Sequence, residues 1–255
     1  MDKKSIAAQL YTLREFLKTP EDIKKSLGKV KEIGYSAVQV SGIGQIDPFV
    51  LKDIVNELDL NICATHTSYE RLQQDLKNVI KEHQLWNCRY VGIGSLPKAY
   101  SRDREGFTRF AKEASILGRE LAENGLKLIY HNHDFEFERH GEATAMDILM
   151  SESDSDKLGF EIDTYWVQAG GGSPVSWLKK VAGRIDVVHF KDMALTKGKQ
   201  TMAEIGEGNL DWESIIDVCR EINVKWYAVE QDVCARDPFE SLEISFKYLQ
   251  KYLMD

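Results

Sequence analysis

Short apolar runs and longer amphipathic stretches alternate along the whole chain. Eight of the apolar runs have the length and the near-continuous hydrophobic character of buried parallel strands. They are Ser5–Gln9, Tyr35–Val40, Asn61–Thr65, Tyr90–Ile93, Leu126–Tyr130, Leu158–Ile162, Ile185–Val188 and Trp226–Val229. Between these runs, apolar residues recur at intervals of three and four residues, which predicts amphipathic helices.

Recognisable capping sequences mark where several of these helices begin. Four prolines follow a Thr, Asp or Ser, so each proline takes the first helical position behind an N-cap: Pro20, Pro48, Pro174 and Pro238. The expected helices are 20–34, Phe49–Leu58, Tyr69–Leu85, Arg104–Glu123, Ala145–Met150, Val175–Val181, one within Asn209–Asn223, and 238–253. A polar loop is expected over Met193–Gly208.

Eight strand–helix units predict an α/β fold, a (β/α)₈ TIM barrel that forms a single domain over residues 1–255. Consecutive parallel strands need helical crossovers, and eight such units can close into a barrel. The alternative is an open doubly wound sheet, which usually carries a glycine-rich phosphate loop after its first strand. Here that turn reads AAQLYTLRE and contains no glycine, so the barrel is favoured.

The last four predicted strands each end on a residue that can bind a metal. These residues are His131, Asp163, His189 and Glu230. In a parallel barrel the carboxyl ends of the strands open at one mouth, so the four side chains should converge there. Two imidazoles and two carboxylates favour one divalent Mn, Zn, Co or Fe ion over Mg²⁺ or Ca²⁺.

Two alternatives to this metal site stay open. The four residues could be ordinary polar caps of apolar strands. His133 could also replace His131 as the ligand from the fifth strand, because residues two apart on a strand point the same way. We favour His131, since it follows the apolar run directly, as Asp163 and His189 do.

Composition and charge narrow the class of protein. The 255 residues are 43% hydrophobic and 29% charged, as in soluble globular proteins. A net charge of −8 disfavours a nucleic-acid or anionic-membrane partner. No apolar run is long enough to span a membrane, and MDKKSIAAQLYTL lacks the apolar core of a signal peptide, so a cytoplasmic location is expected. The widely spaced cysteines should be buried free thiols: Cys63, Cys88, Cys219 and Cys234.

The motifs around these strand ends resemble those of the xylose isomerase-like TIM-barrel superfamily. The nearest branch is the sugar phosphate isomerases and epimerases, which include tagatose/psicose 3-epimerases and inosose isomerases and dehydratases. FEIDTYW carries Asp163, VVHFKD carries His189, and YAVEQD carries Glu230. YHNHDFEF places His131 where the epimerases have a glutamate. The resemblance covers essentially the whole chain and implies a metal-dependent enzyme that acts on a small carbohydrate.

The resemblance also implies a type of chemistry. The metal would chelate a hydroxyl and a neighbouring carbonyl and stabilise an enediolate after proton abstraction. The epimerases use two glutamates on opposite faces of the substrate, and this chain keeps only Glu230 of that pair. Glu230 is therefore the first base candidate, with Glu136, His133 and Lys191 as alternatives. Lys191 could also stabilise oxyanion charge, or it could be a solvated lysine at a strand end. Glu136 and Glu138 could likewise form a solvated face.

Further polar residues are expected around the same mouth. Candidate substrate-binding residues are Gln9, Tyr11, His66 and Trp166. The alternatives are a structural role for His66 and core packing for Trp166. Trp166 stands where the epimerases have a histidine that contacts the substrate. The run Gly170-Gly171-Gly172 could cradle a phosphate at a helix N-terminus, but we favour a plain tight loop, since a glycine run is a weak signal for phosphate binding.

Several functions compete at this point. Isomerisation or epimerisation of a sugar comes first, and dehydration of a keto-sugar or inosose comes second. An endonuclease IV-like nuclease would need more metal ligands than a chain with six histidines and a charge of −8 offers. A non-catalytic sugar-binding barrel is a further alternative, and a homo-oligomer is compatible with the sequence.

Overall fold

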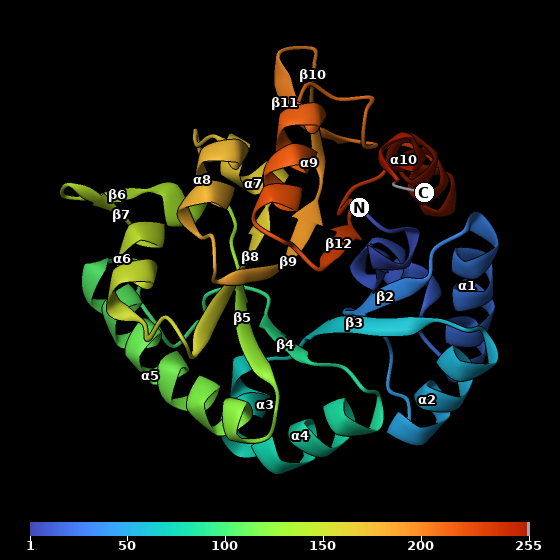
Figure 1. Cartoon of the computed structure of the whole chain (residues 1–255), viewed down its shortest axis with the longest axis horizontal. Helices are drawn as coiled ribbons and strands as arrows, with labels where there is room; N and C mark the ends of the chain where they lie inside the picture. The colour runs from blue at the N-terminus through green and yellow to red at the C-terminus, as the bar shows by residue number, and fades with distance from the viewer. Residues whose placement is uncertain (254–255) are drawn as a thin grey trace.

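Eight parallel strands form a closed barrel at the centre of the computed structural model, which describes residues 1–253 (Figure 1). The strands are β1 Ile6–Gln9, β2 Ala37–Val40, β3 Asn61–His66, β4 Tyr90–Ile93, β5 Lys127–His131, β8 Leu158–Asp163, β9 Ile185–Phe190 and β12 Trp226–Val229. Around the barrel they run in the order β1-β12-β9-β8-β5-β4-β3-β2, and β1 pairs with β2 to close it. The (β/α)₈ prediction is confirmed.

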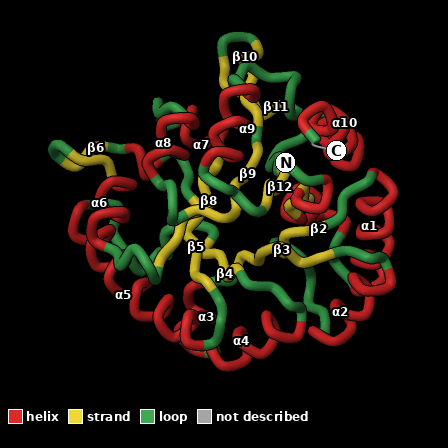
Figure 2. Tube along the Cα trace, viewed as in Figure 1, coloured by secondary structure: helices red, strands yellow, loops and turns green. Residues whose placement is uncertain are grey.

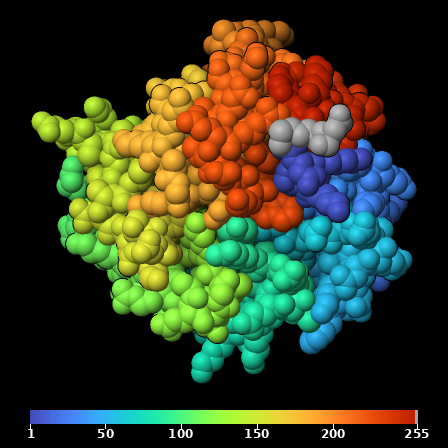
Figure 3. Space-filling model, viewed as in Figure 1, coloured from blue at the N-terminus to red at the C-terminus, as the bar shows by residue number. Residues whose placement is uncertain are grey.

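An outer layer of helices surrounds the strands, as Figure 2 shows. The helices are α1 Pro20–Ile33, α2 Pro48–Glu57, α3 Tyr69–Gln74, α4 Leu76–Leu85, α5 Arg104–Glu123, α6 Ala145–Glu152, α7 Thr164–Ala169, α8 Pro174–Lys180, α9 Trp212–Glu221 and α10 Pro238–Leu249. All four predicted proline starts are confirmed, and the residue before each proline accepts a backbone hydrogen bond as N-cap. In the space-filling view the colours run around the ring, so that the last helix lies against the first segments of the chain (Figure 3).

Short elements complete the part of the chain that the structure describes. Four 3₁₀ helices cover η1 Lys3–Ser5, η2 Leu10–Phe16, η3 Phe135–Phe137 and η4 Gln250–Tyr252. Two hairpins lie outside the barrel: β6 Arg139–His140 with β7 Ala143–Thr144, and β10 Asp192–Thr196 with β11 Lys199–Ala203.

The barrel interior has an apolar layer and, above it, a polar layer. Ala7, Ala37, Ile129, Val187 and Ala228 belong to the small inner core, separate from the large core between strands and helices. Side chains two residues apart on a strand point the same way. The side chain two positions after each of these residues therefore also points into the barrel. These side chains belong to Gln9, Gln39, His131, His189 and Glu230. This alternation carries polar groups into the carboxyl end of the barrel.

Two predictions of local structure were wrong. The helix expected over Tyr69–Leu85 is broken at Asp75, whose backbone leaves the helical region at φ −140°. The Asn78 amide donates to the Asp75 carboxylate at 2.7 Å and so stabilises the start of α4. The polar loop expected over Met193–Gly208 contains most of the β10–β11 hairpin, which extends outward from the barrel (Figure 1).

Two other expectations can be compared with the structure. All four cysteines are free, and all except the half-buried Cys234 are buried. Within residues 1–253, no helix combines the length and the hydrophobicity needed to cross a membrane.

A pair of helical glycines tests the packing of the helices on the barrel. A Cβ at Gly118 of α5 would lie 2.0 Å from the Lys157 carbonyl oxygen, whereas a Cβ at Gly28 of α1 would meet nothing within 4 Å. Gly118→Ala should destabilise the protein by about 1–3 kcal/mol through overpacking. Gly28→Ala should stabilise it by about 0.5–1 kcal/mol, the ordinary helix preference for alanine. Urea denaturation measures both, and equal effects at the two sites would contradict this packing.

His83 of α4 should make stability depend on pH. Its Nδ1 donates to the Val79 carbonyl at 2.7 Å, and its Nε2 accepts from the Thr65 hydroxyl at 2.8 Å. Burial lowers the pKa of His83 from 6.5 to about 4. The unfolded chain therefore takes up a proton first as the pH falls, and stability is lost between about pH 6.5 and pH 4.

The variant His83→Gln keeps a donor and an acceptor but does not titrate. From pH 7.5 to pH 5, the wild type should lose about 2 kcal/mol more unfolding free energy than this variant, in line with a shift of this size. Urea titrations at both pH values measure the difference. An equal loss of unfolding free energy in both proteins would show that His83 is not responsible for the pH dependence.

Candidate active site

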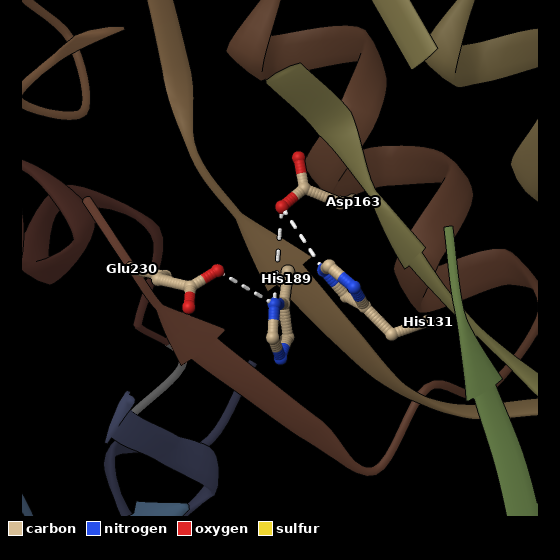
Figure 4. Close-up of side chains that lie close together, drawn as sticks. All are labelled: His131, Asp163, His189 and Glu230. Carbon is tan, nitrogen blue, oxygen red and sulfur yellow. Dashed lines mark hydrogen bonds and ion pairs between the residues drawn. The ribbon is translucent and has the colours of Figure 1, made fainter. Parts of the chain in front are cut away.

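Four of the predicted side chains meet at the carboxyl end of the barrel. His131, Asp163, His189 and Glu230 are all buried, and one donor atom from each lies within 4.8 Å of the others. Figure 4 shows the carboxylates of Asp163 and Glu230 directed at the same nitrogen of the His189 ring, with His131 facing Asp163. The four residues, called the quartet below, thus form a cluster with a composition suited to a divalent transition metal.

The hydrogen bonding of His131 supports a cation at this place. Its Nδ1 donates to the carbonyl oxygen of Gly94 at 3.1 Å. In a neutral ring this leaves Nε2 as an acceptor, and Nε2 faces Asp163 Oδ2 at 3.3 Å. Two facing acceptors need a proton or a metal between them. A histidine whose second nitrogen donates to a carbonyl is the usual arrangement of a metal ligand, so the site fits a metal.

Asp163 is oriented by the helix that follows it. As the N-cap of α7, its Oδ1 accepts from the Trp166 backbone amide at 2.9 Å. Its own amide donates to Asn132 Oδ1 at 3.0 Å. Both contacts fix the carboxylate, and they leave Oδ2 directed at the other members of the quartet.

His189 connects the quartet to a deeper polar layer. Its Nδ1 donates to Glu230 Oε2 at 2.9 Å, and its Nε2 donates to Gln39 Oε1 at 2.8 Å. Burial alone would lower the pKa of His189, but the charges of Glu161 and Glu230 raise it to about 10. The ring is therefore an imidazolium here, and it would have to lose the Nδ1 proton to bind a metal.

Glu161 is the main residue that the sequence analysis missed. It is fully buried, accepts from Gln39 Nε2 at 2.9 Å, and lies 2.6 Å from Nε2 of His66. Burial opposes ionisation of Glu161, but His189 and His66 hold its pKa well below the usual range. The sequence does contain a signal for Glu161, because it is a charged residue inside an apolar run, two positions before Asp163.

A buried lysine reaches into the quartet. Lys191 is 1% exposed, and its Nζ lies 2.9 Å from Asp163 Oδ2, 2.8 Å from Glu230 Oε2 and 3.1 Å from Asp232 Oδ2. Burial would lower the pKa of Lys191, but these three carboxylates raise it. The solvated lysine considered from the sequence is therefore wrong. Asp232, the third carboxylate, was not predicted.

A cavity of about 590 Å³ opens above the quartet. His131 and Glu230 line it, together with the predicted residues Tyr11, His66, His133, Trp166 and Lys191. Gln9 does not: it is fully buried, and its Oε1 accepts from the Tyr11 backbone amide at 2.7 Å. A role of Gln9 in substrate binding stays a prediction.

Glu136 also lies outside the residues that line this cavity. It is fully buried, accepting from the Tyr130 hydroxyl at 2.5 Å and from the His133 backbone amide at 2.8 Å. Burial raises the pKa of Glu136 to about 7. The solvated-face interpretation is wrong for Glu136, although Glu138 is exposed. Its contacts position the loop that carries His133.

Two polar atoms at the cavity have no hydrogen-bond partner within residues 1–253. They are His133 Nδ1 and Trp166 Nε1, and the two rings lie 5.4 Å apart. Burial lowers the pKa of His133 to about 3, so its ring is neutral. Both nitrogen atoms are themselves buried, so each carries the desolvation cost of an unpaired polar group.

The glycine run has a packing explanation. A Cβ at Gly170 would lie 2.6 Å from the Phe137 ring, and Gly171 has φ +81°, a conformation that favours glycine. These constraints account for the run as a tight turn between α7 and α8.

The fold and the site can now be compared with known proteins. The sequence matches the model of the family described as xylose isomerase-like TIM barrel over residues 27–252. The chain belongs to the xylose isomerase-like TIM barrel family. This agrees with the resemblance seen in the strand-end motifs.

Individual relatives agree with this family assignment. An inosose dehydratase of Lactiplantibacillus plantarum is 28% identical over 176 residues, which is 62% of this chain and 58% of that protein. The chain thus matches less than two thirds of the length of this relative. A sugar phosphate isomerase/epimerase from Parabacteroides distasonis has a TM-score of 0.81 at 22% identity, covering 98% of this chain and 94% of that chain. An L-ribulose 3-epimerase has a TM-score of 0.74 at 13% identity, covering 99% and 95%. The two structures show the shared fold.

Asp163→Asn tests the metal site. Asparagine can still cap α7, so the fold should survive, while the loss of a charged ligand should lower Mn²⁺ or Zn²⁺ affinity at least tenfold, the lower end of the effect of disturbing a metal site. Metal content after gel filtration and calorimetric titration measure this. Circular dichroism is the control for folding. Unchanged metal stoichiometry and affinity would refute the assignment of Asp163.

Proposed function

We propose that this protein is a metal-dependent enzyme that removes a proton next to the carbonyl of a keto-sugar or keto-polyol. The observation that carries this proposal is the quartet below a cavity of about 590 Å³, which is large enough for a sugar ring. A divalent metal bound there would act as a Lewis acid on the carbonyl and the adjacent hydroxyl, which stabilises an enediolate.

Glu230 is the first candidate for the base. It lines the cavity at the end of β12, and its carboxylate is ionised because Lys191 and His189 offset the effect of burial and hold its pKa well below 4.5. His133 is the second candidate, since its neutral ring lines the same cavity and keeps Nδ1 unpaired within residues 1–253. Lys191 places its ammonium where it can stabilise developing oxyanion charge.

Dehydration is the outcome we favour. After proton loss, expulsion of a β-hydroxyl gives an unsaturated product, and this route does not need a second carboxylate on the opposite face. Here the strand-five position holds His131, not a glutamate. The name of the relatives, inosose dehydratase, supports the same reaction class and a cyclic keto-polyol as substrate.

Isomerisation or epimerisation is the second candidate, and one feature of the site favours it. His66 lines the cavity from β3, which is three strands away from β12, the strand that precedes Glu230. Its Nε2 is hydrogen-bonded to the buried Glu161 carboxylate at 2.6 Å. A histidine oriented by a carboxylate can transfer a proton, and this one would return it from a different side of the cavity than Glu230.

The other functions receive less support. Within residues 1–253 the candidate metal-binding groups are the quartet and the cluster of His66, Glu161 and His189, which share one histidine. A three-metal nuclease site would need more ligands, and the charge of −8 offers no general attraction for DNA. A non-catalytic sugar-binding barrel remains an outcome of the test below.

Incubation of the Mn²⁺-loaded protein with inosose, tagatose and L-ribulose in D₂O tests the proposal. Proton NMR should show loss of the signal next to the carbonyl, and absorbance of an unsaturated ketone should appear if dehydration follows. An epimer without such absorbance would select the second candidate. Full metal occupancy with no exchange across a broad panel of keto-sugars would instead favour a binding protein.

Glu230→Gln identifies the base once a substrate is confirmed. Loss of general-base catalysis typically costs 10²–10⁴-fold, so deuterium incorporation should fall by at least about 10²-fold. Metal content is measured in parallel, because Glu230 is also a proposed ligand. If the variant holds full metal and exchanges at the wild-type rate, Glu230 is not the base, and His133→Asn is tested next.

A further inference from the structure

We propose that the Lys191 ammonium and a divalent metal compete for the same carboxylate oxygens, and that Asp232 receives the ammonium when the metal binds. This inference rests on the metal site of the proposed function, but it concerns binding and not the reaction. It assigns to Lys191 and Asp232 a role in setting metal affinity.

The Lys191 ammonium lies against both carboxylates of the quartet. Lys191 Nζ lies 2.9 Å from Asp163 Oδ2 and 2.8 Å from Glu230 Oε2, the two carboxylates of the quartet. A transition metal would bind the same carboxylates at about 2.0–2.2 Å. The ammonium is therefore the counter-ion of Asp163 and Glu230, the same carboxylates that a metal would bind.

Oε2 of Glu230 has two hydrogen-bonding partners. Its Oε2 already accepts from His189 Nδ1 at 2.9 Å and from Lys191 Nζ at 2.8 Å. A carboxylate oxygen has two lone pairs, so both acceptor positions of this atom are in use. His189 stops donating to this atom when its Nδ1 binds a metal. Lys191 Nζ is then the donor that still lies against Oε2 and against Asp163 Oδ2, and its positive charge opposes that of the metal.

Asp232 offers a place for the displaced ammonium. Asp232 Oδ2 is already 3.1 Å from Nζ, and its side chain is 22% exposed, on the cavity side of the fully buried Asp163. The Lys191 backbone is held by Thr164, whose Oγ1 accepts from its amide at 3.0 Å and donates to its carbonyl at 2.8 Å. The flexible four-carbon side chain can therefore shift its end toward Asp232 while the backbone stays in place.

Metal affinity of the stripped full-length protein, measured without substrate by chelator competition with Mn²⁺ and Zn²⁺, tests this inference. Lys191→Met removes the competing charge, so the dissociation constant should fall at least tenfold. Without metal, the same variant should lose about 10 °C or more in Tm, because buried carboxylates lose their partner. Saturating Mn²⁺ should recover most of that loss.

Lys127→Met is the matched control. Lys127 pairs with Asp186 at 2.6 Å, and its residue begins β5, at the end of the barrel opposite to the quartet. Its loss should leave metal affinity within twofold of the wild type. An equal gain in affinity in both variants would mean a general charge effect and would overturn the proposal.

A double-mutant cycle tests the role of Asp232 and does not depend on the stability of one variant. Asp232→Asn should weaken Mn²⁺ binding at least fivefold when Lys191 is present and less than twofold in the Lys191→Met background. Equal weakening in both backgrounds would show that Asp232 acts on the metal directly. A zinc-bound crystal structure should place Nζ within hydrogen-bonding distance of Asp232 and beyond it from Glu230 Oε2.

The outcomes separate this inference from the proposed function. An unchanged or weaker affinity in Lys191→Met overturns the competition and leaves the metal-dependent reaction standing. If Lys191→Met binds metal more tightly but the wild type turns over no keto-sugar, the competition is supported and the proposed reaction is contradicted. Failure of both the wild type and Lys191→Met to bind either metal overturns both.

Discussion

The burial of several carboxylates at one end of the barrel is the constraint on which the rest of the site depends. Glu161 and Asp163 are fully buried and Glu230 is 5% exposed, with Asp232 beside them. An ionised group without a partner in such surroundings is very costly. Lys191 and the His189 imidazolium supply the opposite charges, and removing one partner of a buried pair typically costs about 3–5 kcal/mol. The groups suited to chemistry here are therefore also needed for folding.

The barrel makes this concentration of charge possible through its small inner residues. An eight-stranded barrel has an interior just wide enough for side chains to fill. Ala7, Ala37 and Ala228 occupy the apolar layer, so the longer Gln39 and Glu161 side chains above them can meet near the axis. Gln39 then links the Glu161 carboxylate to His189 on another strand. The polar layer is thus a connected network in which each member orients the next.

The barrel and the quartet were predictable because their signals are local. Each barrel strand is an apolar run, proline caps mark four of the helices, and each quartet residue directly follows a run. Glu161 and Gln39 were missed because they lie inside runs, where only the two-residue periodicity reveals that they face inward. The break at Asp75 and the β10–β11 hairpin depend on backbone and pairing contacts that leave the hydrophobic pattern unchanged. The contact of Lys191 with Asp163, Glu230 and Asp232 depends on distances between strands, which no single segment contains.

The histidine at the end of β5 and the lysine after β9 are connected through the charge balance of the site. With neutral His131 and His189, the two charges of a divalent metal would be balanced by Asp163 and Glu230. Lys191 and Asp232 would then balance each other as a separate pair, 3.1 Å apart already. A glutamate in place of His131 would add a negative charge near the ammonium and hold it in the quartet. His131 therefore permits the ammonium to leave while the charges of Asp163 and Glu230 stay balanced, which connects the departure from the epimerase pattern with the position of Lys191.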